Sequence, residues 1–484
     1  MYKIAIQYNN ALNYPLSFLP DSVYPESPFK ATGNTNKENY VYKMLRDAFI
    51  SLELDKENIG TTEWNPLERY VKPGNTVVIK PNLVLHKNYR KGHSDDTDCV
   101  FTHPSVAAAI IDYVIIALKG DGKIIVGDAP IQECDFETLI TKSGYKDVVD
   151  YYKKQGVNIQ LKDFRGVISR SDYGVLHQTV NPDAEYTIVN MDKHSEFASI
   201  GKDELKRIRI TNYNPEELLR HHNENVQEYC VAQDILKADC IINVPKPKTH
   251  KKAGITACLK NLVGMNCRKE YLPHHTIGSA EQGGDEYCGK SRLKEARTKL
   301  HDAFCENVYN EKYLKARICQ AEILAIDFYI NHFTKDKTSF GSWYGNNTIS
   351  KTTIDLNKIA IYADKNGVIQ DKPQRTFLNV ADMIISGQHN GPMAPEPRPV
   401  GILLVGENSF ASDLVIAKLM RAKIDKIPTL NQLRADDPLI IYDKSNPIEI
   451  VSNDERWNGC TPTDLNDGNT FKYKSPDDWE ECFE

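Results

Sequence analysis

In the first half of the chain, hydrophobic residues form two short continuous runs with one longer apolar run between them. Residues 76–82 (TVVIKPN) and 123–130 (KIIVGDAP) are continuous runs rich in β-branched residues, which predicts two buried strands. Residues 103–120 between them predict a helix that Gly120 closes. Two strands joined through a helix are expected to be parallel, and their carboxyl ends then share one sheet edge, where α/β proteins form ligand sites.

The pattern changes between residues 155 and 215. Short β-type runs interrupted by polar and turn residues predict an inserted small sheet or cap. Strand and helix alternation then resumes, with a strand over 239–245, a helix from about Ile255, a helical stretch near 313–331, and a strand, turn and helix over 401–422. The final residues, 475–484, are polar and are expected to form a loosely attached tail.

These elements predict an α/β fold of mostly parallel sheets flanked by helices, with an inserted small β-rich subdomain. A chain of 484 residues is too long for one ordinary hydrophobic core and suggests two or three structural units. The expected segments are an N-terminal α/β unit (1–155), a β-rich insertion or cap (156–225), a second α/β unit (226–430) and a C-terminal extension (431–484).

Composition and charge argue against several classes of binding partner. The 60 basic and 66 acidic residues give a formal net charge of -6, which argues against a general nucleic-acid binder. No segment approaches the roughly 18 apolar residues that a membrane span needs. We therefore expect a cytoplasmic protein that binds neither nucleic acid nor membrane, and we leave an oligomer open.

Eleven cysteines are scattered without a C-x-x-C pair. Zinc ribbons and ferredoxin-type clusters therefore lack their usual ligand spacing, and an iron–sulfur cluster is not expected. Reduced thiols in a reducing compartment are the expected state.

A basic stretch, NVPKPKTHKKAGITACLKNLVG, spans residues 243–264. Pro245 and Pro247 should end the preceding strand and stiffen its exit, ahead of the amino terminus of the helix expected from about Ile255. Free N–H groups and the positive dipole end, next to ammonium groups, suit a phosphate or carboxylate. The alternative is a solvated lysine loop. The candidate residues are Lys246, Lys248, His250, Lys260 and Asn261.

The first strand pair adds four candidates, Lys80, Asn82, His103 and Asp128. Lysine can neutralise an anion, asparagine can both donate and accept hydrogen bonds, and histidine or aspartate can move or orient a proton. The alternatives are a surface lysine, a helix cap at His103 and a turn-forming aspartate.

Residues 272–287 place His274 and His275 ahead of Asp285 and Glu286. Imidazoles and carboxylates on one loop are candidate ligands for a divalent metal, and the alternatives are a hydrogen-bonded loop or a lid over a substrate. Adjacent residues on an extended chain point to opposite sides, so only one of the two histidines should reach a given point.

Residues 341–347 form a loop of glycine, aromatic residues and asparagine before a predicted helix. Trp343 could stack on a ring or sugar, and Asn347 could bind its hydroxyls. The alternative is a packed tryptophan in a turn with a helix cap.

Several segments resemble the domain of unknown function 362 family: VVIKPNLV, THPSVAAAIID, IIVGDAP, INVPKPKTHKKAGITACLKNLVGMN, WYGNNTISKTTIDLNKI and VGENSFASDLVIAKLM. The resemblance covers about residues 70–425 and implies an α/β fold without an assigned reaction. Some relatives carry a ferredoxin module, whose cysteine spacing this chain lacks. Lys351 stands where relatives often have arginine, so a bidentate anion contact is not carried over.

The leading hypothesis is an enzyme that uses Lys/His acid–base chemistry on a small carboxylate or phosphate, with metal assistance left open. The candidate catalytic residues are His250, Lys248, His103 and Asp128. Isomerase or racemase-like and oxidoreductase-like reactions both stay open. The alternative is a non-catalytic accessory protein that binds a metal, a cofactor or a partner.

Overall fold

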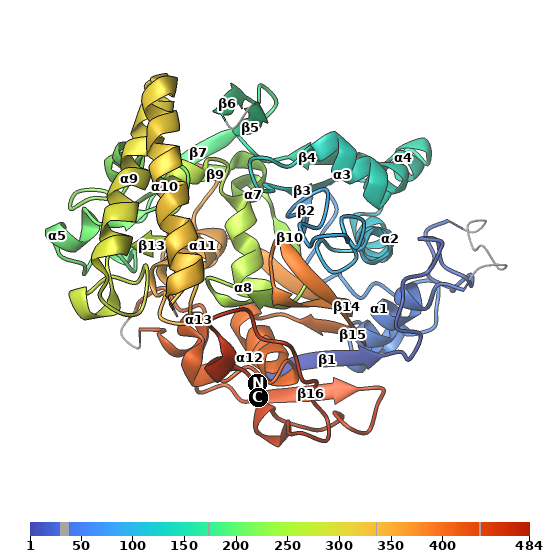
Figure 1. Cartoon of the computed structure of the whole chain (residues 1–484). Coiled ribbons are helices and arrows are strands. Elements are labelled where there is room, and N and C mark those ends of the chain that lie inside the picture. The colour runs from blue at the N-terminus through green and yellow to red at the C-terminus, as the bar shows by residue number, and fades with distance from the viewer. Residues whose placement is uncertain (30–37, 173–174, 335, 435–436) are drawn as a thin grey trace.

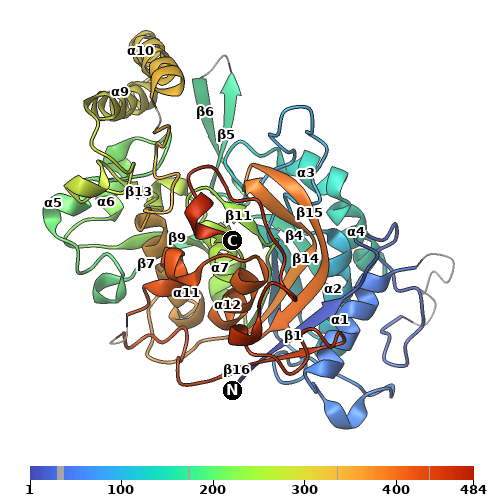
Figure 2. The same cartoon turned by 60° about the horizontal axis from the view of Figure 1, so that its bottom comes forward.

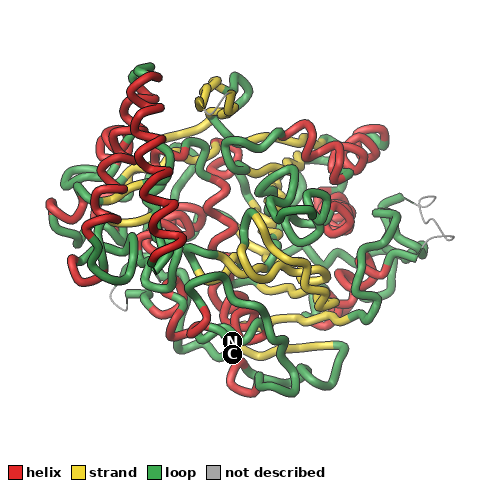
Figure 3. Tube along the Cα trace, in the orientation of Figure 1, coloured by secondary structure: helices red, strands yellow, loops and turns green. Residues whose placement is uncertain are grey.

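A computed structural model describes residues 1–29, 38–172, 175–334, 336–434 and 437–484. A mixed ten-stranded sheet crosses the molecule with helices on both sides (Figures 1 and 3). Its main strand order is β16-β1-β15-β14-β10-β2-β3-β4. The strands are β1 (Tyr2–Tyr8), β2 (Thr76–Pro81), β3 (Lys123–Asp128), β4 (Ile159–Asp163), β10 (Cys240–Val244), β14 (Thr376–Asn390), β15 (Ala394–Gly406) and β16 (Ile448–Ser452). The predicted α/β class is confirmed.

Most pairings in this sheet are parallel. From β14 through β10, β2 and β3 to β4 every pairing is parallel, whereas β15 runs antiparallel to both β14 and β1. Strand β2 is continuously apolar because both of its faces are buried. Val77 and Ile79 pack into one core with α1 (Tyr40–Ser51) and α2 (Pro104–Leu118), while Val78 packs into a second core on the opposite face.

The predicted βαβ unit is confirmed. Strands β2 and β3 are parallel neighbours, and helix α2 joins them. The helix ends at Leu118 because Lys119 and Gly120 turn the backbone into the left-handed region, with φ values of 53° and 84°. The carboxyl ends of the two strands therefore lie together, as expected.

The segment predicted as a β-rich insertion contributes β4 to the large sheet and other strands to small antiparallel sheets. These are β5 (Val167–Asp172) with β6 (Val175–Val180), β7 (Tyr186–Asn190) with β9 (Glu228–Ala232), and β8 (Ile208–Arg209) with β13 (His275–Thr276). The segments predicted as two α/β units both supply strands to the one large sheet.

The predicted helix from about Ile255 is wrong. Strands β11 (Lys248–His250) and β12 (Gly254–Thr256) form a short antiparallel pair there, and α8 (Cys258–Asn261) follows. Gly254 allows this turn, because its φ is 75° and an added Cβ would lie 2.4 Å from Ile427. The apolar spacing that suggested a helix belongs partly to a strand that is buried on both sides.

The structure contains further helices, most of them packed around the sheet. They are α3 (Phe136–Ser143), α4 (Tyr145–Lys154), α5 (Lys202–Leu205), α6 (Pro215–His221), α7 (Gln233–Lys237), α9 (Arg292–Tyr309), α10 (Tyr313–Phe333), α11 (Thr348–Tyr362), α12 (Ser409–Leu419) and α13 (Pro428–Asn431). No helix in the described ranges is both long and apolar enough to cross a membrane. Each of the eleven cysteines has a free thiol.

The carboxyl-terminal residues are packed, so the predicted loose tail is wrong. Trp479 and Cys482 are fully buried, and the Trp479 indole N–H donates to the carbonyl of Lys251, 2.6 Å away. A few apolar residues in a polar segment were sufficient to anchor it against the β11–β12 turn.

Candidate functional site

A cavity of about 510 Å³ lies at the carboxyl ends of β2 and β3. Asn82, which follows β2, and Asp128, the last residue of β3, line it. The β11–β12 turn and α8 contribute further polar side chains, and the loop before β13 adds His274. Six candidates from the sequence meet here: Asn82, Asp128, His250, Lys260, Asn261 and His274.

Four lysines line the cavity, and one of them, Lys251, pairs with Asp477 at 3.3 Å. The other three, Lys252, Lys260 and Lys269, form no ion pair within the described ranges of the chain. The ammonium of Lys252 donates to the carbonyl of Phe340 at 2.6 Å and to Thr211 Oγ1 at 3.0 Å. The ammonium groups of Lys260 and Lys269 have no hydrogen-bond acceptor among the described residues. A partly buried cation without a counter-ion is costly and favours an anion from outside.

Burial also changes the protonation of these lysines. Burial, together with the charges of Lys269 and Lys252, lowers the pKa of Lys260 to about 7. Burial lowers the pKa of Lys252 to about 8 against the attraction of Asp285, and that of Lys269 to about 8 against Asp128. An anion in the cavity would favour the charged forms of all three.

Two buried oxygens beside the lysines have no hydrogen-bond partner among the described residues, Thr256 Oγ1 and Asn261 Oδ1. The Asn261 amide is held in place because its Nδ2 donates to Asn243 Oδ1 at 2.8 Å. Its free Oδ1 is suited to accept a hydrogen bond, and the Thr256 hydroxyl can donate one. Both residues line the cavity, so a ligand there can satisfy them.

The two histidines of the cavity are held in opposite tautomers. His250 Nδ1 accepts from the backbone N–H groups of Lys252 and Ala253, 3.0 and 3.2 Å away, so its proton lies on Nε2. His274 Nδ1 lies 2.7 Å from the carbonyl of Leu272 and must donate to it, which leaves a lone pair on Nε2.

Burial keeps both rings neutral, because it lowers the pKa of each well below 6.5, and nearby lysines lower it further. His250 is thus a fixed hydrogen-bond donor, since a second proton on its Nδ1 would face two N–H groups. His274 is better placed than His250 for the predicted acid–base role.

Lys80 and Asp128 form a buried ion pair instead of a free substrate contact. Lys80 Nζ lies 2.7 Å from Asp128 Oδ1, and Asp128 Oδ2 accepts from the backbone N–H of Leu83 at 2.7 Å. The pair joins the ends of β2 and β3. Gly264 packs directly on it, because an added Cβ would lie 2.0 Å from Asp128 Oδ1.

Lys246, Lys248 and His103 lie outside the cavity wall. Lys246 is fully buried against Asp382 at 2.6 Å, and Lys248 donates to Asn82 Oδ1 at 2.7 Å. His103 caps α2 and stacks on Tyr14 with ring centroids 3.9 Å apart, and burial lowers its pKa to about 3. These contacts hold the cavity walls in place, and the cap that we considered for His103 is confirmed.

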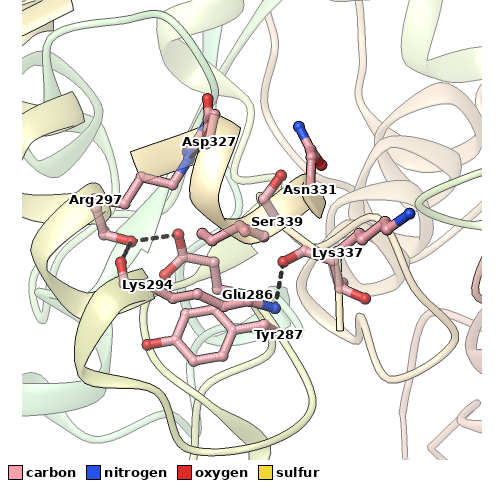
Figure 4. A pocket seen from close by; sticks show the side chains of 11 residues that line it. Glu286, Tyr287, Lys294, Arg297, Asp327, Asn331, Lys337 and Ser339 are labelled. Atoms are coloured by element: carbon pink, nitrogen blue, oxygen red, sulfur yellow. Dashed lines mark hydrogen bonds and ion pairs between the residues drawn. The ribbon is translucent and has the colours of Figure 1, made fainter. Parts of the chain in front are cut away.

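The four candidate metal ligands do not converge. His274 faces the cavity, while His275 does not line it and packs near Phe340. Asp285 accepts from the backbone N–H groups of Asn347 and Thr348 at the start of α11. Glu286 lies in a separate cavity of about 130 Å³ at α9 and α10, beside Tyr287 and Lys294 (Figure 4). Among the described residues no group of three or more His, Cys, Asp or Glu side chains could hold a metal.

The loop before α11 supports His274. Trp343 is buried, and its indole N–H donates to the carbonyl of Asp285 at 2.8 Å. Asn347 does not line the cavity, whereas the neighbouring Asn346 donates to the carbonyl of His274 at 2.9 Å. The packed-tryptophan alternative therefore describes this loop.

The expected helix amino terminus does not serve as the anion site. The first N–H groups of α8, at Cys258 and Leu259, donate to Asp413 at 2.6 and 3.0 Å. Two residues that the sequence did not identify, Lys252 and Lys269, line the cavity instead, together with Thr256. Lys252 belonged to the visible basic run, but nothing in the sequence placed Lys269 next to it.

Comparison with other proteins identifies a family but no activity. A family model described as Domain of unknown function (DUF362) matches residues 77–182 and 187–418. A thylakoid-associated protein of Synechocystis sp. is 21% identical over 390 residues, which cover 79% of this chain and 76% of that protein.

A crystal structure of a Thermotoga maritima protein, a structural genomics target, aligns over 74% of this chain at 10% identity and a TM-score of 0.29. The alignment spans about half of that protein, 54% of its chain. A TM-score this low supports no argument about fold or function.

Proposed function

Because the chain belongs to the DUF362 family, whose description names no activity, we propose a function from the cavity itself: an enzyme that acts on a small carboxylate or phosphate. The observation that carries the proposal is the pair of ammonium groups on Lys260 and Lys269, which line a cavity without a carboxylate partner in the described ranges. A bound anion would remove the cost of holding these charges away from water.

The remaining wall indicates what else the substrate contains. Val84, Ile131, Ile210, Phe340 and Met393 line the cavity with apolar surface. A substrate with an anionic head and a small apolar body would fill both parts. The free lone pair of His274 Nε2 is suited to take a proton from such a substrate, and the nearby ammonium groups would stabilise the negative charge that develops. This arrangement favours proton-transfer chemistry of the isomerase or racemase kind.

Binding of the anion should weaken as pH rises. Sulfate is a suitable probe because it does not titrate in this range. Lys260 loses its charge above pH 7, and Lys252 and Lys269 lose theirs above pH 8, so the affinity should fall by up to about tenfold per pH unit between pH 7 and 8 and more steeply above pH 8. Calorimetric titration between pH 6.5 and 9 measures this slope. A constant affinity would contradict the cationic site.

Replacing His274 separates catalysis from binding. In His274→Asn the amide can still donate to the Leu272 carbonyl but offers no Nε2 lone pair. We expect turnover to fall by about 100-fold or more, while the affinity for sulfate changes little. Depletion of anionic metabolites from a defined mixture, followed by mass spectrometry, measures turnover, and His93→Asn on the exposed surface is the control. A parent protein that binds sulfate but consumes nothing would be an accessory binding protein.

Two expectations from the sequence stay proposals, the cytoplasmic location and the absence of nucleic-acid and membrane partners. The word thylakoid describes the Synechocystis relative alone. Metal assistance has no ligand cluster among the described residues to support it.

A further inference from the structure

Helices α9 and α10 form an antiparallel hairpin that projects from the body of the molecule (Figures 1 and 2). An ion pair between Arg297 and Asp327 ties the two helices together. Ala316, Ile323 and Ile330 are the buried residues of α10 and recur every seven positions. One narrow stripe of α10 is therefore packed, and the opposite face is open to solvent.

The open face of α10 is apolar. Six large side chains on it are each more than half exposed: Leu314, Ile318, Leu324, Phe328, Tyr329 and Phe333. At about 100° per residue they fall within roughly one half of the helix circumference. Surface helices normally place polar residues on the solvent side, and an apolar face of this extent marks an interaction site.

We propose that this face binds a second copy of the chain through an antiparallel α10–α10 contact. The midpoint of α10 is Ile323, and an antiparallel pair centred there brings several apolar positions of the two copies together. In such a pair Ile318 of one copy faces Phe328 of the other, and Ala321 faces Ala325. The two alanines are exposed at the centre, where small residues let helices approach closely, and larger side chains meet on both sides of them.

The available area fits a stable dimer. Six half-exposed side chains of this size offer roughly 100 Å² each, so the pair would bury about 1,200 Å² in total, the lower end for specific interfaces. The charges on the same side of α10 argue against a lipid surface. Lys315 and Arg317 with Glu322 leave a net charge of only +1 on that side, so the described part of α10 has no band of basic residues of the kind that draws a helix to anionic lipid. This inference does not depend on the proposed activity.

Sedimentation equilibrium of the full chain between about 1 and 50 μM tests the proposal. The parent should be dimeric, and Phe328→Glu should raise the dissociation constant at least 100-fold with an unchanged thermal midpoint. Gln320→Glu, an exposed position on the same helix outside the apolar face, is the matched control and should stay dimeric. If Phe328→Glu does not fold, Ala321→Glu at the central contact replaces it.

Two results would overturn the inference. One is a parent protein that is monomeric over the whole concentration range. The other is a folded Phe328→Glu variant that stays as dimeric as the parent, since the dimer would then use another face; if the parent is monomeric, flotation with phosphatidylglycerol vesicles that Phe328→Glu abolishes would assign the apolar face to lipid.

Discussion

Lys260→Met should weaken sulfate binding and at the same time stabilise the unliganded protein. The substitution removes a partly buried ammonium that has no acceptor among the described residues but keeps an unbranched side chain of similar length. We expect sulfate affinity to fall by at least tenfold and the free energy of unfolding at pH 7 to rise by about 1–3 kcal/mol. Calorimetry and urea denaturation measure the two quantities.

The gain in stability should depend on pH. The pKa of Lys260 is about 7 in the folded protein and near 10.5 when the chain is unfolded, so the unfolded state binds more protons in between. The parent therefore becomes more stable as pH rises from 7 toward 10, and the advantage of Lys260→Met shrinks over the same range. Lys299→Met, at an exposed site on α9, should change neither property. If Lys260→Met is destabilised at pH 7, the ammonium has a partner, and the site is not an empty anion site.

Asp128→Ala should cause the largest loss of stability. It leaves the ammonium of Lys80 fully buried without a counter-ion and removes the acceptor of the Leu83 backbone N–H, whereas the Ala129 N–H keeps the carbonyl of Gly264 at 2.8 Å. The expected cost is about 3–5 kcal/mol, because the uncompensated charge must either stay in the interior or lose its proton. Urea denaturation of the purified variant measures it.

The double variant Asp128→Ala with Lys80→Met identifies the cause. Removing the orphaned ammonium should return about 2 kcal/mol of the loss, although the single changes are not additive. Asp150→Ala, at an exposed position of α4, should change the free energy of unfolding by less than about 0.5 kcal/mol. A loss below about 1 kcal/mol for Asp128→Ala would show that the pair is not needed to join β2 and β3.

Local patterns were sufficient for much of the fold. The continuous apolar runs of β2 and β3 and the capped helix between them predicted a parallel βαβ unit, because each element buries its own side chains against the next. The pattern failed at residues 254–263, where strand β12 is buried on both faces and Lys260 is the one partly exposed residue of helix α8. Periodicity distinguishes helix from strand only when one face is polar.

For the site, the sequence by itself determined that the ends of β2 and β3 meet, and so placed Asn82 and Asp128 together. It named His250, Lys260 and Asn261 from the basic stretch and His274 as a metal ligand, and all six now line one cavity. Only the tertiary structure decided their states. In the folded chain Lys80 pairs with Asp128, and Lys246 pairs with Asp382. Asp413 accepts the hydrogen bonds at the amino terminus of α8, and Lys269 lies beside Lys260. A lysine's role depends on whether an acid lies within a few ångströms, and contacts between residues distant in the chain set that distance.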